Sequence, residues 1–182
     1  MDEDHQFEVR KKSVNILGID IGTKTGYCYN RGEQLTLGTW ELATDKEITR
    51  WGKTRQRRTE DPRIDRLCKR VDALGHFDVV IFEDVEFASS TYQVQLWSSL
   101  RASVWLCSSK TAIQCIPVGT LKLFATGDGH AGKEKMHKFF QREKLHGMHL
   151  ETVLTDDSID AYFLHKWAKQ NISLSICKNS NG

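Results

Sequence analysis

Residues 16–28 read ILGIDIGTKTGYC, and this stretch decides the fold. Its first half is apolar and rich in β-branched residues, a pattern typical of a buried strand, but it contains one carboxylate, Asp20. A glycine turn follows at once and leads into a second apolar run. A buried carboxylate is costly unless a cation, N–H donors or solvent meets it, so Asp20 needs a partner from elsewhere in the chain.

The segments around this stretch predict an α/β domain with a mixed sheet and helices on its faces. The expected strands are residues 14–21, 26–30, 34–42, 77–84 and 111–118, and the expected helices are residues 61–74 and 92–109 and two that start near 133 and 156. We expect one domain over residues 1–182, with an ordered core at about 13–170 and loose ends at 1–12 and 173–182.

Composition sets the size class and the compartment. The 182 residues are 39% hydrophobic and 27% charged, which suits one domain with a real core. No run approaches the roughly 18 apolar residues of a membrane span, and the first residues do not resemble a signal peptide. The five cysteines are scattered without C-x-x-C spacing, as expected for reduced thiols. We therefore expect a soluble protein of the cytoplasm, in a bacterium or a phage-infected host cell, with no membrane partner.

Two further segments repeat the pattern of an acid at the edge of an apolar element. The strand FDVVIFED ends in Glu83 and Asp84, which point to opposite faces, and alternation alone leaves open which one faces a site. In the segment TDDSIDA, Asp156 and Asp157 can be explained as helix caps. Asp160 cannot be explained as a cap. It lies three residues after Asp157, inside the helix and on the same face as Asp157.

Four acids that converge on one spot would repel each other unless a multivalent cation neutralised them. Carboxylate oxygens in this number favour Mg²⁺, with Mn²⁺ as the other possibility. Two such ions, about 4 Å apart, hydrolyse phosphodiesters: one activates the attacking water and the other stabilises the leaving oxygen. The competing interpretation is that each acid is a separate cap or an exposed strand end.

The motifs GIDIGTKTGYC, VVIFEDV, a glycine-rich loop ending in lysine, and DDSIDA occur in an order and at a spacing that resemble the RuvC-type Holliday junction resolvases of the RNase H-like superfamily. The resemblance runs from about residue 14 to 168 and suggests a phage or otherwise divergent member. It implies a five-stranded sheet whose first three strands are antiparallel. It also implies that the metal-binding catalytic acids are Asp20, Glu83, Asp157 and Asp160, with Glu83 rather than Asp84 facing the site.

The activity implied by the resemblance is structure-selective cleavage of DNA. A homodimer would bind a four-way junction and cut two strands of like polarity symmetrically, leaving 5′-phosphate and 3′-hydroxyl ends. Two-fold symmetry would offer one active site to each of two equivalent strands. The helix at residues 92–109 is apolar on more than one face, and we expect it to form the dimer interface.

Two segments are expected to contact the DNA. The family often carries an aromatic residue three positions after its second acid, which wedges into or stacks at the junction. This chain has Glu86 at that position, so the next residue, Phe87, is the candidate for the role. Residues 46–70 contain ten basic residues against four acidic ones, with Trp51 among them. Such a cluster can bind phosphates and stack on a base, or it can be a solvated loop that leads into a helix. The candidate phosphate contacts there are Arg50, Lys53, Arg55, Arg57 and Arg58.

The glycine-rich loop at residues 127–133 could instead be a nucleotide-binding site. It satisfies both G-x-G-x-x-G and G-x-x-x-x-G-K, but Glu134 stands where a P-loop needs Ser or Thr. In the resolvase interpretation the loop presents N–H groups and Lys133, a catalytic and DNA-binding candidate, to the scissile phosphate.

Three further classes of protein could carry the same motifs. They are a nuclease of relaxed specificity for flaps, forks and three-way junctions, an ATPase-type domain, and a DNA-binding protein without catalysis. The ATPase families duplicate this core, for which the chain is too short. The presence of all four acids favours a nuclease over a protein that only binds DNA.

Overall fold

The computed structural model describes residues 13–54, 60–84, 90–108, 111–143 and 147–179, and for residues 173–179 the backbone alone. The expected loose end at 1–12 lies outside the described residues. At the other end, the last helix continues to Asn179, beyond the predicted core limit at about residue 170.

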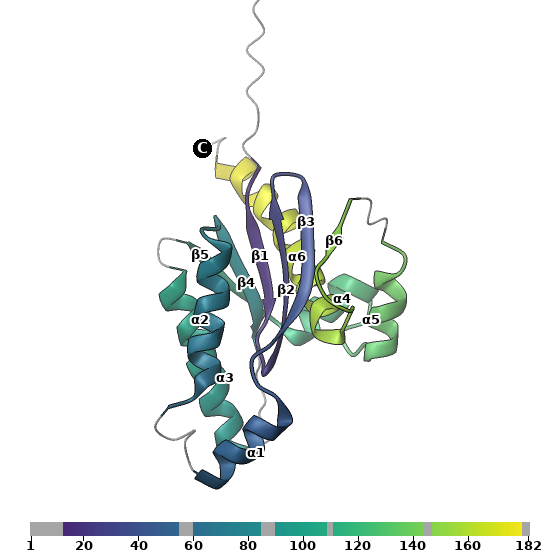
Figure 1. The fold of residues 1–182 in the computed structure, drawn as a ribbon. Helices are drawn as coiled ribbons and strands as arrows, with labels where there is room; N and C mark the ends of the chain where they lie inside the picture. Colours follow the sequence, from purple (N-terminus) through teal and green to yellow (C-terminus); the bar gives the residue numbers. More distant parts are fainter. Residues whose placement is uncertain (1–12, 55–59, 85–89, 109–110, 144–146, 180–182) are drawn as a thin grey trace, which may run out of the picture.

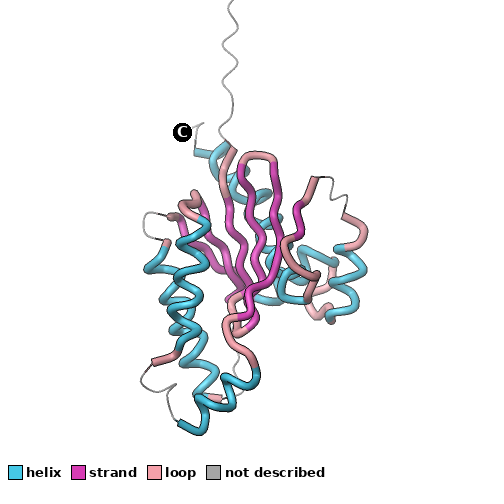
Figure 2. Tube along the Cα trace, viewed as in Figure 1, coloured by secondary structure: helices cyan, strands magenta, loops and turns pink. Residues whose placement is uncertain are grey.

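Six strands form one mixed sheet in the order β5-β4-β1-β2-β3-β6 (Figures 1 and 2). The strands are β1 Ile16–Asp20, β2 Lys24–Arg31, β3 Gln34–Glu41, β4 Val79–Asp84, β5 Ala112–Pro117 and β6 His149–Leu150. The first three strands are antiparallel, as predicted, while β4 lies parallel to β1 and β5 parallel to β4. The prediction of five strands is wrong, because β6, two residues paired with the outer side of β3, is too short to produce a pattern.

Six helices complete the described part of the chain. They are α1 Asp45–Thr54, α2 Pro62–Leu74, α3 Thr91–Cys107, α4 Val118–Thr126, α5 Lys133–Phe140 and α6 Asp156–Asn179. The helix α1 replaces the expected loop, and a reciprocal cap starts it: the Thr44 amide donates to Glu47 Oε2 and the Glu47 amide donates to Thr44 Oγ1. No described helix is both long and apolar enough to cross a lipid bilayer.

Each face of the sheet carries its own hydrophobic cluster, so helices cover both faces, as predicted (Figure 1). On one face, alternate strand residues such as Ile16 and Ile81 pack with α4, α5 and α6. On the other face, the intervening residues Leu17, Val80 and Phe82 pack with α2 and α3. This alternation assigns every side chain of β1 and β4 to one face or the other.

Two glycines let α6 lie directly on the sheet. A Cβ atom at Gly18 in β1 would stand 2.5 Å from the carbonyl oxygen of Ala161, and one at Gly26 in β2 would stand 1.9 Å from that of Asp157. Both distances are well under 3.0 Å, a separation that real Cβ atoms essentially never show. Glycine at these two positions therefore sets how closely the first turns of α6 approach β1 and β2.

A buried amide ties the same helix to the strand ends. Asn30 Oδ1 accepts from the Ile16 amide at 2.9 Å and from His165 Nε2 at 2.9 Å, while Asn30 Nδ2 donates to the carbonyls of Val14 and Gly32 at 3.0 Å each. Since Oδ1 only accepts, His165 must carry its proton on Nε2. Burial, and secondarily the charge of Lys169, lowers the pKa of His165 to about 4, so this imidazole is neutral at pH 7.

Candidate active site

The candidate site lies at the carboxyl ends of β1 and β4. These strands are parallel, and the register that pairs Ile19 with Phe82 brings Asp20 and Glu83 to neighbouring positions where the strands end. Glu83 follows Ile81 on the α6 face of the sheet, whereas Asp84 lies on the α3 face and accepts from Arg101 Nη2 at 3.0 Å. The question that alternation left open is thereby answered geometrically: Glu83, not Asp84, shares a face with Asp20.

Helix α6 brings the other two acids to this edge. Its first turn is capped by Thr155, whose Oγ1 accepts from the Ser158 amide at 3.2 Å, while Ser158 Oγ accepts from the Thr155 amide at 2.9 Å. The interpretation of Asp156 and Asp157 as caps is therefore wrong. Their side chains are left for other contacts, and Asp157 and Asp160 turn towards the strand ends.

The four carboxylates lie close enough to affect each other's ionisation. Burial, and then the charges of Glu83, Asp160 and Asp157, raises the pKa of Asp20 well above its usual range. Burial, and then Glu83, raises the pKa of Asp160 to about 7. Burial also raises the pKa of Glu83 and of Asp157. The charged forms of all four carboxylates are therefore destabilised at one edge of the sheet.

The nearest cations are lysines, and they only partly offset this charge. Lys133 lowers the pKa of Asp20, and Lys122 of α4 lowers that of Asp160 and Glu83, but in each case burial outweighs the lysine. Among described residues, no side chain forms a hydrogen bond or ion pair with the carboxylates of Asp20, Glu83 or Asp160.

The donor set fits a hard divalent cation in chemistry and in charge, because it consists of carboxylate oxygens whose mutual repulsion such an ion would remove. Within the described ranges, no three histidine, cysteine or acidic side chains stand in a preformed metal cage.

A cleft of about 680 Å³ is lined by two of the four acids, Asp20 and Asp157, while Glu83 lines only a smaller hollow beside it. The rest of the lining comes from the turn after β1, from Trp97 of α3 and from the starts of α5 and α6. Its lining residues are Asp20, Ile21, Gly22, Thr23, Lys24, Trp97, Lys133, His137, Leu154, Thr155, Asp156 and Asp157. A smaller hollow beside it is lined by Asp20, Ile21, Glu83, Trp97 and Arg101.

Lys133 begins α5 at the mouth of this cleft. Its Nζ donates to Asp156 Oδ2 at 2.7 Å, while His137 Nε2 donates to Asp156 Oδ1 at 2.7 Å. Asp156 therefore fixes a lysine and an imidazole at the rim, and these two hydrogen bonds lower its pKa. Sequence reasoning missed His137 and Lys122, which carried no motif, and misread Asp156, whose position matches that of a cap.

The glycine-rich loop joins two helices. Gly127 ends α4 in the left-handed region at φ 75°, and Gly132 precedes the first residue of α5. A dinucleotide fingerprint instead joins a strand to a helix, so the nucleotide-site interpretation lacks its structural context.

Three of the seven described basic residues in the segment at 46–70 pair with acids of the same chain. Arg63 is 2% exposed and holds Asp61 at 2.6 Å, Arg66 pairs with Glu47 at 2.7 Å, and Lys69 pairs with Asp65 at 2.7 Å. Trp51 is 1% exposed, so it cannot stack on a base. Burial of the guanidinium and the indole turns part of this segment into core.

Arg50 and Lys53 lie on the exposed side of α1, beside a separate shallow hollow that shares no lining residue with the cleft. The structure therefore does not bring them together with the acids. The remaining candidates, Arg55, Arg57, Arg58 and Phe87, lie outside the described residues.

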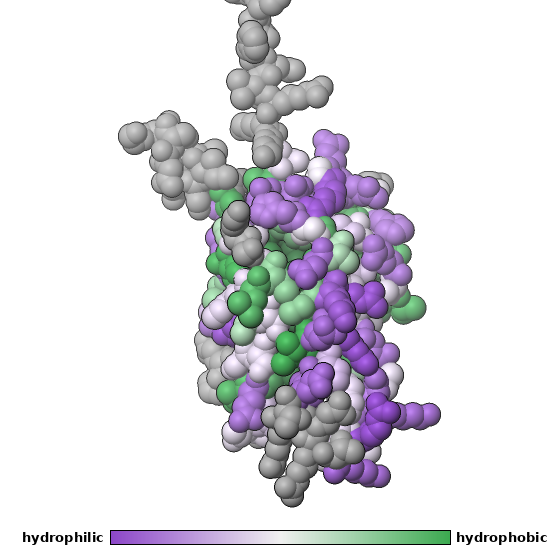
Figure 3. Space-filling model, turned by 60° about the vertical axis from the view of Figure 1, so that its left-hand side comes forward, coloured by the Kyte–Doolittle hydropathy of each residue, from purple (hydrophilic) through white to green (hydrophobic). Residues whose placement is uncertain are grey.

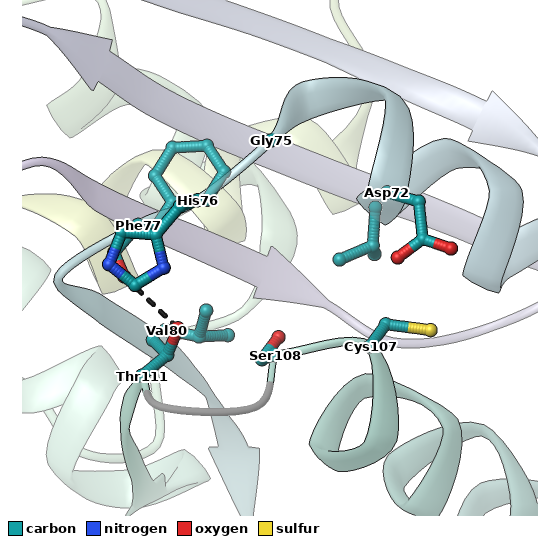
Figure 4. A pocket seen from close by; sticks show the side chains of 9 residues that line it. Asp72, Gly75, His76, Phe77, Val80, Cys107, Ser108 and Thr111 are labelled. Carbon is teal, nitrogen blue, oxygen red and sulfur yellow. Dashed lines mark hydrogen bonds between the residues drawn. The ribbon is translucent and has the colours of Figure 1, made fainter.

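A further hollow, of about 240 Å³, lies where α2 and α3 end (Figure 4). Asp72, His76, Cys107 and Thr111 line it, and the Thr111 hydroxyl donates to the Phe77 carbonyl at 3.0 Å. Burial, and then contact with Cys68, raises the pKa of Cys107 to about 12, so this thiol is protonated at pH 7. None of the predicted site residues lines this hollow.

The strand order of the mixed sheet, with helices on both faces, defines the class of fold, and the four acids lie where its first and fourth strands end. No protein-family model and no curated protein matches the chain. Several solved structures match it, and they have the fold of RuvC-type resolvases.

The structure of Thermus thermophilus RuvC matches at 15% identity and a TM-score of 0.52, over 86% of this chain and 95% of that one. T. thermophilus RuvC in complex with Holliday junction substrate matches at 16% identity and a TM-score of 0.58, over 87% of this chain and 97% of that one. The yeast mitochondrial Holliday junction resolvase Ydc2 matches at 14% identity and a TM-score of 0.54, over 90% of this chain and 83% of that one. The chain thus has the RuvC-type fold over most of its length.

Proposed function

We propose that this protein is a divalent-metal-dependent endonuclease that resolves four-way DNA junctions, with an RNase H-like catalytic core. The observation that carries the proposal is the set of four mutually repelling carboxylates at one sheet edge, in a fold shared with RuvC and Ydc2. A binding protein without catalysis would gain nothing from this costly concentration of charge.

In this proposal Asp20, Glu83, Asp157 and Asp160 hold two Mg²⁺ ions, or Mn²⁺. The bound ions would supply an activated water and would neutralise charge on the phosphate. The chain itself contributes the orientation of these carboxylates, through the α6 contact with Gly26 and through the Thr155 cap. Lys133, held at the rim by Asp156, donates to a phosphate oxygen of the bound strand.

A homodimer would present two such clefts to the two equivalent strands of a junction and make paired symmetric nicks. Exposed apolar side chains on α3 support this arrangement: Val94 is 50% exposed, Trp105 52% and Leu106 79%. Figure 3, which turns the side of α2 and α3 forward, shows apolar (green) side chains among polar ones on the surface. Exposed apolar surface is a common feature of protein–protein contact sites. Gel filtration with light scattering at micromolar concentration tests this; a monomer at that concentration contradicts the dimer.

The deciding experiment is cleavage of matched four-way, three-way, flap and linear DNAs with Mg²⁺, with Mn²⁺ and with EDTA. We expect metal-dependent paired nicks in the four-way junction and little cutting of linear duplex. Equal cutting of all substrates would favour the nuclease of relaxed specificity. Binding of junctions without cleavage in any metal would instead favour a DNA-binding protein without catalysis.

A further inference from the structure

The side chain of Trp97 stands in the cleft. It lies on α3 and lines both the main cleft and the smaller hollow beside it, and Asp20 is also part of both linings. The indole thus shares the main cleft with Asp20, Lys133 and Asp156. Within the described part of the chain, Trp97 is the one Phe, Tyr or Trp in these two linings.

Packing within the fold does not account for this placement. Trp97 is partly buried but belongs to neither hydrophobic cluster, whereas Leu100 and Val104, on the next turns of α3, are fully buried in the core. Among described residues, no hydrogen bond, ring contact or cation–π contact involves Trp97. The indole therefore lines the cleft without a hydrogen bond or ring contact to any described residue.

The lining of the cleft combines the two kinds of group that a nucleotide needs. Asp20 and Asp157, with bound cations, and Lys133 suit a phosphate, while the indole of Trp97 suits the flat face of a base. Stacking on aromatic side chains is a general source of affinity for unpaired nucleotides, and each stacked base is worth on the order of tenfold to a hundredfold in binding.

We propose that Trp97 forms a base-stacking subsite, on which a nucleobase next to the scissile phosphate rests. The position of the phosphate rests on the proposed function; the stacking itself requires only that single-stranded or unpaired DNA enters the cleft. A base held there would fix the backbone on either side of it, so Trp97 is a specificity residue rather than a participant in bond cleavage.

The test uses a four-way junction carrying 2-aminopurine at the nucleotides that flank the cleavage position. Binding is measured in the Asp20→Asn background, which prevents cutting, for Trp97, Trp97→Phe and Trp97→Leu. We expect Trp97→Leu to weaken binding on the order of tenfold and to abolish the change in 2-aminopurine fluorescence, and Trp97→Phe to restore most of both. When Trp97→Leu is made in the protein that keeps Asp20, cleavage can be measured as well. The junction concentration that gives half-maximal cleavage should then rise by a larger factor than the single-turnover rate falls.

Leu123→Ala is the control for the removal of exposed apolar surface, because Leu123 lies on α4, is 56% exposed and lines neither hollow, and it is not part of the surface proposed for the dimer. Gel filtration and circular dichroism check that all variants keep the parent's assembly and fold. Unchanged affinity and fluorescence in Trp97→Leu would overturn the proposal, as would equal losses in Trp97→Leu and Leu123→Ala.

Failure of the proposed function looks different. A parent protein that cuts no DNA in any metal, yet shows the fluorescence change that depends on Trp97, would remove the nuclease and leave the stacking subsite. If the parent cuts junctions and Trp97→Leu cuts and binds them equally well, the nuclease would stand and the stacking subsite would be removed. A parent that binds no DNA would overturn both.

Discussion

Gly26 of β2 and Asp157 of α6 meet backbone to backbone: a Cβ atom on the glycine would stand 1.9 Å from the aspartate's carbonyl oxygen. Gly26 also pairs with Asp20 across the β1–β2 ladder. One glycine therefore sets the spacing between an acid from the start of the chain and an acid from its last helix.

Gly26→Ala should separate these two acids. The clash is with backbone atoms and cannot be relieved by turning a side chain, so α6 or β2 must shift, at roughly 2–4 kcal/mol of unfolding free energy. We expect loss of most cleavage activity together with a lower urea midpoint. Gly119→Ala is the control, because a Cβ there meets only an ordinary contact at 3.7 Å. Similar behaviour of the two variants would show that the close approach is unimportant.

Asp20→Asn should abolish cleavage and, without metal, make the protein more stable. The substitution removes a buried negative charge that Glu83, Asp160 and Asp157 repel, so we expect an increase in melting temperature of a few degrees, about the effect of 1 kcal/mol. Differential scanning calorimetry in EDTA and then in Mg²⁺ measures this. Mg²⁺ should stabilise the wild type more than the variant. A variant less stable than the wild type in EDTA would contradict the charge repulsion described above.

Lys133→Met should lower the single-turnover cleavage rate by about a hundredfold, since in the proposed mechanism it would remove a donor to the scissile phosphate. Lys135→Met serves as a control: Lys135 lies on the same helix and pairs with Asp128 at 2.8 Å, but it does not line the cleft. Quench-flow cleavage of a labelled junction compares the two. Equal rates for both variants would remove Lys133 from the site.

His165 should lower stability as the pH drops below the ordinary pKa of histidine. Its folded pKa of about 4 lies below the unfolded value of about 6.5, so the unfolded chain binds the extra proton first. This residue alone should raise the unfolding free energy by roughly 3 kcal/mol between pH 4 and 6.5. The four acids act in the opposite direction over this range, because their pKa values are raised in the folded protein. The measurement is therefore the difference in unfolding free energy between the wild type and His165→Gln, which keeps an N–H donor for Asn30, in urea titrations at pH 4.5 and 7. This difference should be larger at pH 7 than at pH 4.5; an equal difference at both pH values would assign the effect elsewhere.

Arg63→Met should destabilise the fold by about 3–5 kcal/mol, because it takes the cation away from the buried carboxylate of Asp61. The same guanidinium donates to Thr23 Oγ1 at 2.9 Å, in the turn after Asp20, and to the hydroxyl of Tyr92. Lys69→Met, which breaks an exposed pair, should change stability by at most about 0.5 kcal/mol. Equal urea midpoints for the two variants would contradict the structural role of Arg63.

Much of the fold could be predicted from local patterns. The strand around Asp20, the meander after it and the helix that starts at Asp156 each have a periodicity that packing preserves. The helix α1 also had a readable signal, since Thr44 and Glu47 stand at capping-box spacing, but the high charge of the segment suggested a loop. The strand β6 had none, because two residues owe their conformation entirely to β3.

The site was less predictable, for a physical reason. Alternation could show that Glu83 and Asp84 face opposite ways, but only the partner of Asp84, Arg101 on α3, shows which face each occupies. Likewise, the burial of Arg63 and Trp51 depends on tertiary contacts that a count of charges does not contain. The position of Trp97 in the cleft could not be predicted either, because its helix is apolar on several sides and the sequence does not show which apolar residue lacks a packing partner.

The four acids lie far apart in the sequence, and this has a consequence for synthesis. Asp20 and Glu83 leave the ribosome long before α6, and without Asp157 and Asp160 a nascent chain holds only half of the proposed ligands. The proposed activity would therefore arrive only with the final helix, so a stalled or truncated product lacking α6 should not cut the genome that encodes it.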